Sequence, residues 1–384
     1  MRKLICGVIA FILGAALFAA GTAESKEKGG ANKLQLNSLP RNQPRITDMY
    51  RWNDRIVVEA DSVFYQINVD SLSSIPLFCP GGRTIVSLVT YKDTEDYAWC
   101  QTPNSSYGHL FKERGDDWGG EQIPDFRNKE METEFRTIEK PVLFLASKEN
   151  RILVTGKSIY LASESGWKKI DILPEEYKGE KVWHDHASAQ HYLLFKNKVF
   201  LGYDHGEFGG GLLALDITTG KWEKIGSGGP VTSIVVSPKE ELWVSKGLAH
   251  MGSEMAEITV FNGTEWSLFS KNHGYLGNRP NQWIVDSDNV NWPFEPASIE
   301  KIYFDQNGNL YVLTGSLGII RYANSKWERI TPCWNEHFYV SSFLKLSPDK
   351  FLLATYDAGV AVMDTKDCSV QPIKLATSFY RFSF

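Results

Sequence analysis

Residues 310–330, LYVLTGSLGIIRYANSKWERI, carry the clearest structural pattern of the chain. Residues 310–313 and 319–322 are short runs of apolar and aromatic residues on either side of a glycine-containing turn. The polar pair Asn324-Ser325 then leads into a third run that contains Trp327. With the run at residues 302–304, this pattern predicts four short strands joined by tight turns.

The same arrangement recurs along the chain. A tryptophan follows a polar turn and precedes a short strand at Trp167, Trp222, Trp266 and Trp327, and Trp118 is a weaker fifth case. Four strands with one tryptophan-marked turn per unit are typical of a β-propeller blade. We expect each ring to cover the outer part of its blade against a neighbouring blade.

The repeats predict an all-β chain with seven four-stranded blades. Their expected bounds are residues 46–79, 83–126, 139–175, 190–226, 231–270, 297–332 and 338–375. The mean length of about 47 residues per blade falls in the range of propeller repeats. Six or eight blades stay open as alternatives, since the first and last units carry no tryptophan at this position.

Residues 310–330 resemble the repeat of two-component-regulator-type propellers, with a strand, a glycine-containing turn, a tyrosine and a tryptophan. Residues 242–266 are similar but carry an insertion. The resemblance is clear over about a third of the chain. It implies an exported bacterial propeller that senses or binds, whereas the kinase of that family has no counterpart in these 384 residues.

The first residues predict export. A basic start at Arg2-Lys3 precedes an apolar run at residues 4–20 and the small residues Gly21-Thr22-Ala23. This order is typical of a signal peptide that is cleaved after Ala23, and a retained membrane anchor is the alternative. We therefore expect a signal at 1–23, a flexible lead-in at 24–45, a propeller at 46–376 and a C-terminal strand or tail at 377–384.

Charge excludes one class of partner. The chain has 41 Lys and Arg against 46 Asp and Glu, a formal net charge of −5, and loss of Arg2 and Lys3 makes it −7. Nucleic-acid binding needs clustered cations, and the sequence has no such cluster. We expect a periplasmic or secreted protein that is not stably inserted in a membrane after cleavage of the signal.

The upper face of the predicted propeller contains the turns between second and third strands and the connections between blades. We expect the longest loops there, at residues 102–108, 204–211, 246–256 and 271–296, together with all eight histidines. Long loops on a rigid scaffold are the usual place for binding. The candidate ligand-binding residues there are His184, His186, His191, Asp204, His205, Glu207, His250, His273, Trp283, Glu336 and His337.

These residue types allow more than one chemistry. Imidazoles and carboxylates that converge could hold a divalent metal, a metal-free polar ligand, or only water around solvated loops. The glycine-rich stretch 204–211 lacks the helix and Lys-Ser/Thr of a phosphate loop. The aromatic tail 378–384 is expected to be a strand packed on the closing blade rather than part of a membrane barrel.

Two functions are compatible with this pattern. The first is a binding module that recognises a protein or a cell-envelope polymer through the upper face. The alternative is a metal-assisted hydrolase or lyase with its site at the propeller mouth. No sequence motif for a catalytic nucleophile is present, so we favour the binding module.

Four cysteines follow the signal, and an oxidising compartment favours disulfides between them. The face assignment predicts a bond between Cys79 and Cys100, both at upper strand ends. Cys333 is expected at the upper face and Cys368 in a lower turn, about 17 Å apart. Either Cys333 and Cys368 form no disulfide with each other, or the expected bounds of the last blade are wrong.

Overall fold

The computed structural model describes residues 46–52, 55–61, 63–77, 84–91, 95–101, 108–112, 141–146, 150–155, 158–163, 166–172, 189–226, 228–250, 253–276, 283–285, 287–331, 334, 340–355 and 359–376. All of them belong to one compact unit. The expected signal at 1–23, the lead-in at 24–45 and the tail at 377–384 lie outside the described residues. No helix among the described residues is long and apolar enough to span a membrane.

The first three antiparallel sheets follow each other along the chain. Their strands are β1 (Ile46–Trp52), β2 (Arg55–Ala60), β3 (Val63–Asn68) and β4 (Ser73–Pro76) in sheet one, β5 (Thr84–Tyr91), β6 (Glu95–Gln101) and β7 (Gly108–Lys112) in sheet two, and β8 (Pro141–Ala146), β9 (Arg151–Thr155), β10 (Ser158–Ser163) and β11 (Gly166–Ile172) in sheet three.

Four further sheets complete the series. Sheet four contains β12 (His191–Phe195), β13 (Lys198–Asp204), β14 (Gly210–Asp216) and β15 (Trp222–Ile225), with the short 3-10 helix η4 (Gly206–Phe208) between β13 and β14. Sheets five to seven contain β16 (Val231–Val236), β17 (Leu242–His250), β18 (Ser253–Phe261), β19 (Trp266–Leu276) and β20 (Trp283–Val285), then β21 (Ile299–Phe304), β22 (Leu310–Thr314), β23 (Gly318–Ala323) and β24 (Lys326–Arg329), then β25 (Val340–Ser347), β26 (Lys350–Thr355), β27 (Gly359–Asp364) and β28 (Val370–Ile373).

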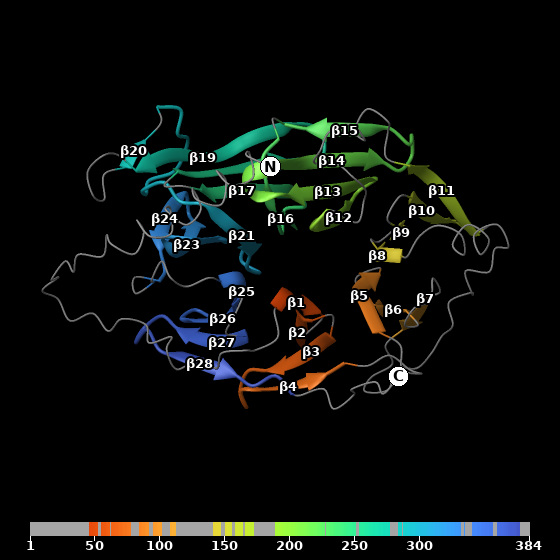
Figure 1. Cartoon of the computed structure of the whole chain (residues 1–384), viewed down its shortest axis with the longest axis horizontal. Coiled ribbons are helices and arrows are strands. Elements are labelled where there is room, and N and C mark those ends of the chain that lie inside the picture. The colour runs from red at the N-terminus through yellow and green to blue at the C-terminus, as the bar shows by residue number, and fades with distance from the viewer. Residues whose placement is uncertain are drawn as a thin grey trace, which may run out of the picture. The chain divides into compact units, whose positions relative to one another are not determined.

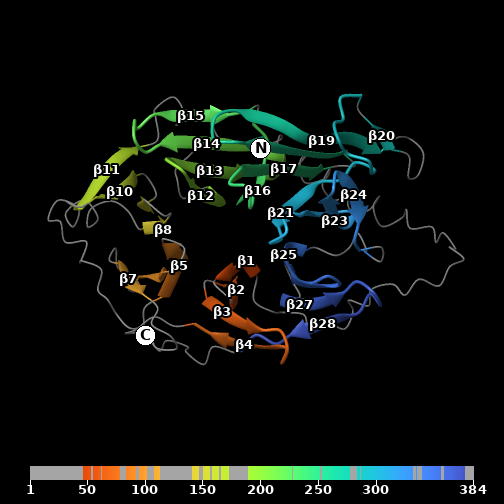
Figure 2. The ribbon, with the colours of Figure 1, turned by 180° about the vertical axis from the view of Figure 1, so that it is seen from behind.

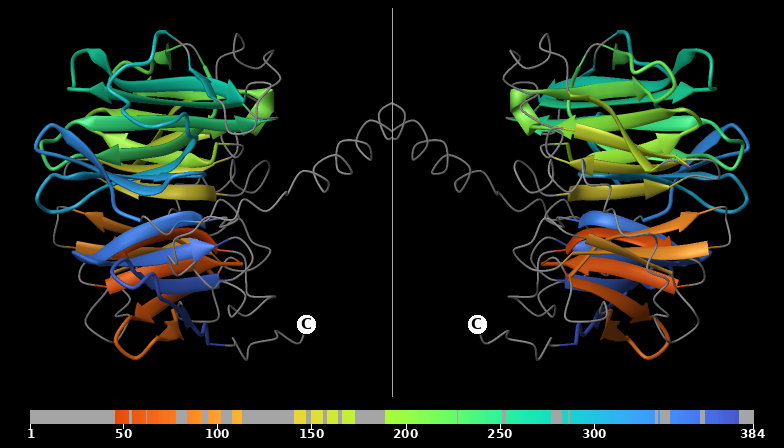
Figure 3. Two further views of the ribbon diagram at one scale, coloured as in Figure 1. Left: turned by 90° about the vertical axis from the view of Figure 1, so that its left-hand side faces the viewer. Right: turned by 90° about the vertical axis from the view of Figure 1, so that its right-hand side faces the viewer.

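The sheets are arranged as a β-propeller. In every sheet the strands pair in chain order, and the first strand of each sheet lies innermost (Figure 1). The view from behind shows the same ring, and the side views show that most strands run along its axis (Figures 2 and 3). The ring closes because β1 contacts β25 and because Ser73 forms a bridge with Lys374.

The blade count corrects the prediction in part. Six sheets have at least four strands and are complete blades, whereas sheet two has three strands among the described residues, so seven four-stranded blades is wrong as stated. Sheet five differs in the other direction, because it has five strands. Residues 246–256 and 271–296 were expected to be loops, but β17, β18 and β19 extend through them and β20 adds an edge strand.

The hydrophobic core lies between neighbouring sheets. One apolar cluster joins sheets four and five through side chains such as Phe200, Leu212, Val244 and Phe261, all of them buried. Similar clusters join sheets three and four, five and six, six and seven, seven and one, and one and two. Burial of apolar surface between sheets therefore holds the ring together.

The repeated tryptophans contribute to this packing. Trp266 in sheet five stacks on Phe261 at 5.0 Å and meets Phe200 of sheet four edge-on at 6.2 Å. Trp327 in sheet six lies 6.1 Å from Phe269 of sheet five. These two rings thus pack on the preceding sheet, which is the structural role expected for them, whereas Trp118 lies outside the described residues.

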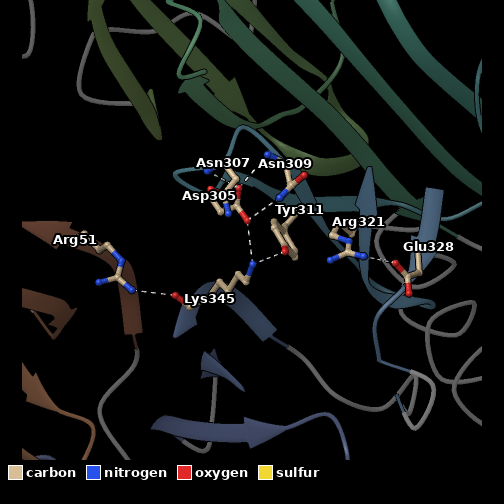
Figure 4. Close-up of polar contacts among 8 residues, drawn as sticks. All are labelled: Arg51, Asp305, Asn307, Asn309, Tyr311, Arg321, Glu328 and Lys345. Carbon is tan, nitrogen blue, oxygen red and sulfur yellow. Dashed lines mark hydrogen bonds and ion pairs between the residues drawn. The ribbon is translucent and has the colours of Figure 1, made fainter. Parts of the chain in front are cut away.

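Polar contacts on the lower face connect sheets six, seven and one (Figure 4). The carboxylate of Asp305, in the turn between β21 and β22, accepts hydrogen bonds from the backbone of Asn307 and Asn309. It also accepts one from the Lys345 ammonium at 2.9 Å, and Lys345 donates to the Tyr311 hydroxyl at 2.6 Å. The Lys345 carbonyl in turn accepts a hydrogen bond from Arg51 in β1.

Two of the described cysteines, Cys100 and Cys368, are disulfide-bonded. Cys100 is buried in β6 and packs with the cluster between sheets one and two. Cys79 and Cys333 lie outside the described residues, so the pairing of Cys79 with Cys100 stays a prediction.

Candidate functional site

The structure places the described candidate residues as follows. His191 begins β12, Asp204 ends β13, Glu207 lies in η4, and His205 precedes η4. His250 ends β17, His273 lies in the extended part of β19, and Trp283 begins β20. His184, His186, Glu336 and His337 lie outside the described residues.

A continuous surface crosses sheets four and five. The His250 imidazole Nδ1 lies 2.8 Å from the carboxylate of Glu207, which connects β17 to η4. In the strand register, His250 of β17 lies opposite Ser253 of β18 and Ser253 lies opposite Tyr275 of β19. Tyr275 in turn lies opposite Ile284 of β20. Adjacent strands lie about 4.8 Å apart, so these residues form one line from η4 to β20. We call Phe208, His250, Tyr275, Ile284 and Val285 the rim strip.

Exposed apolar side chains concentrate on this surface. Phe208 is 79% exposed, Tyr275 46%, Ile284 40% and Val285 51%. Val290 is also exposed and forms an isolated bridge with Lys271 of β19. The other large exposed apolar side chains of the described residues are Ile75, Val236 and Leu268. Five of eight therefore belong to the upper parts of sheets four and five.

The loop that carries Phe208 is held in a defined shape. The Asp204 carboxylate accepts a hydrogen bond from the backbone of Gly206 at 2.8 Å, and the Asp204 backbone donates to the Gln190 side chain at 2.8 Å. A Cβ atom at Gly210 would lie 2.3 Å from the Tyr203 carbonyl and 2.7 Å from Pro230. Close backbone approach therefore requires glycine at this end of the loop.

A second group of polar residues lies at the upper ends of the innermost strands. The Lys301 ammonium in β21 of sheet six lies 2.7 Å from the carboxylate of Asp48 in β1 of sheet one. These two sheets are not neighbours in chain order, because sheet seven comes between them. The pKa of His191 is lowered to about 4, mainly by burial and also by the nearby charge of Lys301. The charge of Asp48 and a hydrogen bond with the Val231 backbone oppose this decrease. At neutral pH His191 is an uncharged hydrogen-bonding group beside an ion pair.

Two carboxylates flank Ser298 beside this group. Glu254 in β18 accepts a hydrogen bond from the Ser298 backbone at 2.7 Å, and Glu300 in β21 lies 3.2 Å from the Ser298 hydroxyl. Burial raises the pKa of Glu300, and the nearby charge of Asp204 adds to the rise, against the hydrogen bond from Ser298. This region is acidic and joins the upper ends of sheets five and six.

The candidate residues that the structure describes thus make contacts in separate groups. Glu207 pairs with His250, His273 lies 3.3 Å from the Ser253 hydroxyl, and His191 belongs to the innermost group. In the described part of the chain, no group of three or more His, Cys, Asp or Glu side chains is arranged to hold a metal ion.

Sequence reasoning missed Asp48, Glu300 and Lys301. In six of the seven sheets, the pairing of the innermost strand with the second strand shifts register near the start of the innermost strand. The shift lies, for example, between Ile46 and Asp48 in β1 and between Ile299 and Lys301 in β21. Aligning the first strands of the repeats would have placed Asp48 and Lys301 at one equivalent position, where Ser342 stands in β25. Charge at that inner position is the signal that could have identified them.

Comparison with known proteins gives matches among solved structures only. No protein-family model and no curated protein matches the chain. Among solved structures, YCF48 bound to D1 peptide is similar, with 12% identity, a TM-score of 0.48, and coverage of 88% of this chain and 95% of that one. A protein of unknown function from Bacteroides caccae is similar at 11% identity, a TM-score of 0.38, and coverage of 86% and 94%.

The similar structures also include extracellular domains of two-component systems. That of the putative hybrid system BT4673 from B. thetaiotaomicron has 11% identity and a TM-score of 0.33. The match covers 86% of this chain and 58% of the other. The four-stranded sheet β21 to β24, one blade of the propeller, agrees with the resemblance expected from residues 310–330.

Proposed function

We propose that the chain is an exported binding module that recognises a protein partner through the rim strip. The concentration of exposed apolar side chains on the upper parts of sheets four and five supports this proposal. Monomeric proteins rarely expose contiguous apolar patches without a use for them, and aromatic residues are enriched at protein interfaces. Export rests on the signal pattern of residues 1–23.

The rim strip combines the features of a recognition surface. Phe208 and Tyr275 offer large apolar area, while the His250–Glu207 pair and the Ser253 hydroxyl supply polar contacts between them. The underlying strands fix these side chains in place, because β17, β18 and β19 pair along their full extended length. A rigid surface loses little conformational entropy on binding.

Site-specific photo-crosslinking tests this function. A benzophenone amino acid is placed at Phe208 or Tyr275, and at Ile75 as the control, because Ile75 is an apolar side chain of sheet one with 61% exposure. We expect both rim positions to capture the same partner in the envelope fraction of the producing cells, and Ile75 not to capture it. Equal labelling from all three positions, or none, would refute the proposal.

A further inference from the structure

The outer strands of most sheets carry groups that discourage strand addition. Exposed charges or proline at a sheet edge prevent pairing with another chain. The edge sequences with such groups are Ser-Ser-Ile-Pro in β4, Gly-Trp-Lys-Lys-Ile-Asp-Ile in β11, Trp-Glu-Lys-Ile in β15, Lys-Trp-Glu-Arg in β24 and Val-Gln-Pro-Ile in β28.

The edge strand β20 differs from all of these. Its sequence Trp-Ile-Val has no charge and no proline, and Ile284 and Val285 are exposed. It is the fifth and last strand of its sheet, beside the extended end of β19 (Figure 1). Among the described residues, no further strand pairs with its outer side. Of the described outer strands β4, β11, β15, β20, β24 and β28, β20 alone has neither a charge nor a proline, and it lies at the end of the rim strip.

We infer that β20 accepts an extended, cationic segment of the partner polypeptide, which adds to sheet five as a sixth strand. This inference rests on the proposed function and specifies how the partner is held. Main-chain hydrogen bonds to the free edge of β20 would supply affinity. Contacts with Ile284 and Tyr275, which lie opposite each other on one face of the sheet, would select alternate apolar side chains of the incoming strand.

The charges around β20 determine the character of the segment. Residues 277–298 contain three acidic residues, Asp286, Asp288 and Glu295, against one basic residue, Arg279. Glu295 is exposed, and Asp288 pairs with Lys271, which balances one of the three charges. An incoming strand with Lys or Arg between its apolar residues therefore complements this surface.

The same charges disfavour a second copy of this chain at the edge. Pairing of β20 with β20 would bring together two copies of residues 277–298, in which three acidic residues stand against one basic residue. Like charges placed opposite each other across an interface reduce affinity. A heterologous cationic strand fits the surface better than self-association does.

A pair of synthetic peptides tests the inference. The probe is a fluorescein-labelled nine-residue peptide of alternating Lys and Val, and its matched control has the same side chains but N-methyl groups on two adjacent central residues, which remove one donor from each edge of the strand. We expect the probe to bind the full mature chain and the N-methylated peptide to bind at least about tenfold more weakly in fluorescence anisotropy. A Glu-Val peptide should not bind.

A protein variant provides the second arm. Ile284→Thr/Val285→Pro places a proline at the edge, as in β4 and β28, and should weaken probe binding about tenfold without changing the circular dichroism spectrum. If this variant does not fold, the two peptides on the unmodified chain still decide the question.

Equal affinity of both peptides, no binding of the probe, or a concentration-dependent dimer that the variant abolishes would each overturn the inference. Partner capture at Phe208 and Tyr275 together with failure of the probe would leave the proposed function intact and remove strand addition alone.

Discussion

The Lys345 ammonium in β25 lies 2.9 Å from the Asp305 carboxylate, in the turn that follows β21. Both side chains are largely buried, with 17% and 8% exposure. This contact joins sheets six and seven on the lower face, opposite the rim strip. The stability of the scaffold can therefore be tested separately from binding.

Replacing Lys345 by Met should destabilise the fold. The change leaves the Asp305 carboxylate and the Tyr311 hydroxyl without the ammonium, and loss of one partner of a buried ion pair costs about 2–4 kcal/mol. Urea unfolding should show this loss. Lys350→Met is the matched control, since Lys350 is exposed and lies 4.0 Å from Asp364, and it should change stability by less than about 0.5 kcal/mol.

The effect of Lys345→Met should also depend on pH. Burial by itself would raise the pKa of Asp305, but hydrogen bonds from Asn309 and Lys345 outweigh it and lower the pKa. A lowered carboxyl pKa stabilises the fold above the unfolded value of about 3.9, and this stabilisation is lost as the pH falls through the folded value. The difference between wild type and variant should therefore be constant near pH 7 and shrink below about pH 4. A difference that grows on acidification would contradict this account.

His191 should make stability depend on pH in a different range. Its pKa is about 4 in the folded chain, mainly because of burial, and about 6.5 when unfolded. Between these values the unfolded state binds more protons, so stability rises with pH and its contribution is complete above about pH 6.5. From pH 4 to pH 7 the gain is about 3 kcal/mol.

Urea unfolding at several pH values, with His191→Gln as the comparison, measures this gain. The variant should lose the rise between pH 4 and pH 6.5, because Gln does not titrate. An unchanged slope in the variant would show that other groups cause the rise.

Gly247 should tolerate no side chain. A Cβ atom there would lie 2.1 Å from the Ile299 carbonyl oxygen and 2.6 Å from the Ile299 nitrogen, at the contact between sheets five and six. Because both obstacles are backbone atoms, Gly247→Ala should cost about 2–3 kcal/mol in thermal or urea unfolding. Ala249→Ser, at an exposed position two residues further along β17, should change stability by less than about 0.5 kcal/mol.

Peptide mapping under non-reducing conditions should identify a Cys79–Cys100 peptide. The loop that this bond closes contains about 20 residues, and chain-entropy estimates give about 3 kcal/mol for its loss. Cys100→Ser should lower stability by a similar amount. A bond between Cys100 and Cys333 instead would show that the expected positions of the strand ends are wrong.

Local patterns in the sequence predicted most of the fold. Each Trp-marked turn, such as Ser325-Lys326-Trp327, is a contiguous signal. Trp327 packs on Phe269 of the preceding sheet, as Trp266 packs on Phe200. The extra strand β20 was missed because Trp283-Ile284-Val285 is too short to show periodicity, and its aromatic surroundings were interpreted as a loop.

The candidate site was less predictable, because its contacts join distant parts of the chain. Asp48 and Lys301 are 253 residues apart and meet only when the ring closes. The His250–Glu207 pair could be anticipated as two upper-face residues, but the register that extends it to Tyr275 and Ile284 depends on the unusual length of β17, β18 and β19.

Amide hydrogen exchange tests the central claim, recognition of a partner through the rim strip, most directly. Exchange is compared in the full mature chain, free and bound to the partner captured at Phe208. We predict slower exchange on binding in residues 206–209, 253–255 and 274–285, and no change in the lower turn 305–309, where the backbone of Asn307 and Asn309 donates to Asp305. Protection of the lower turn with none along the rim strip would contradict the account.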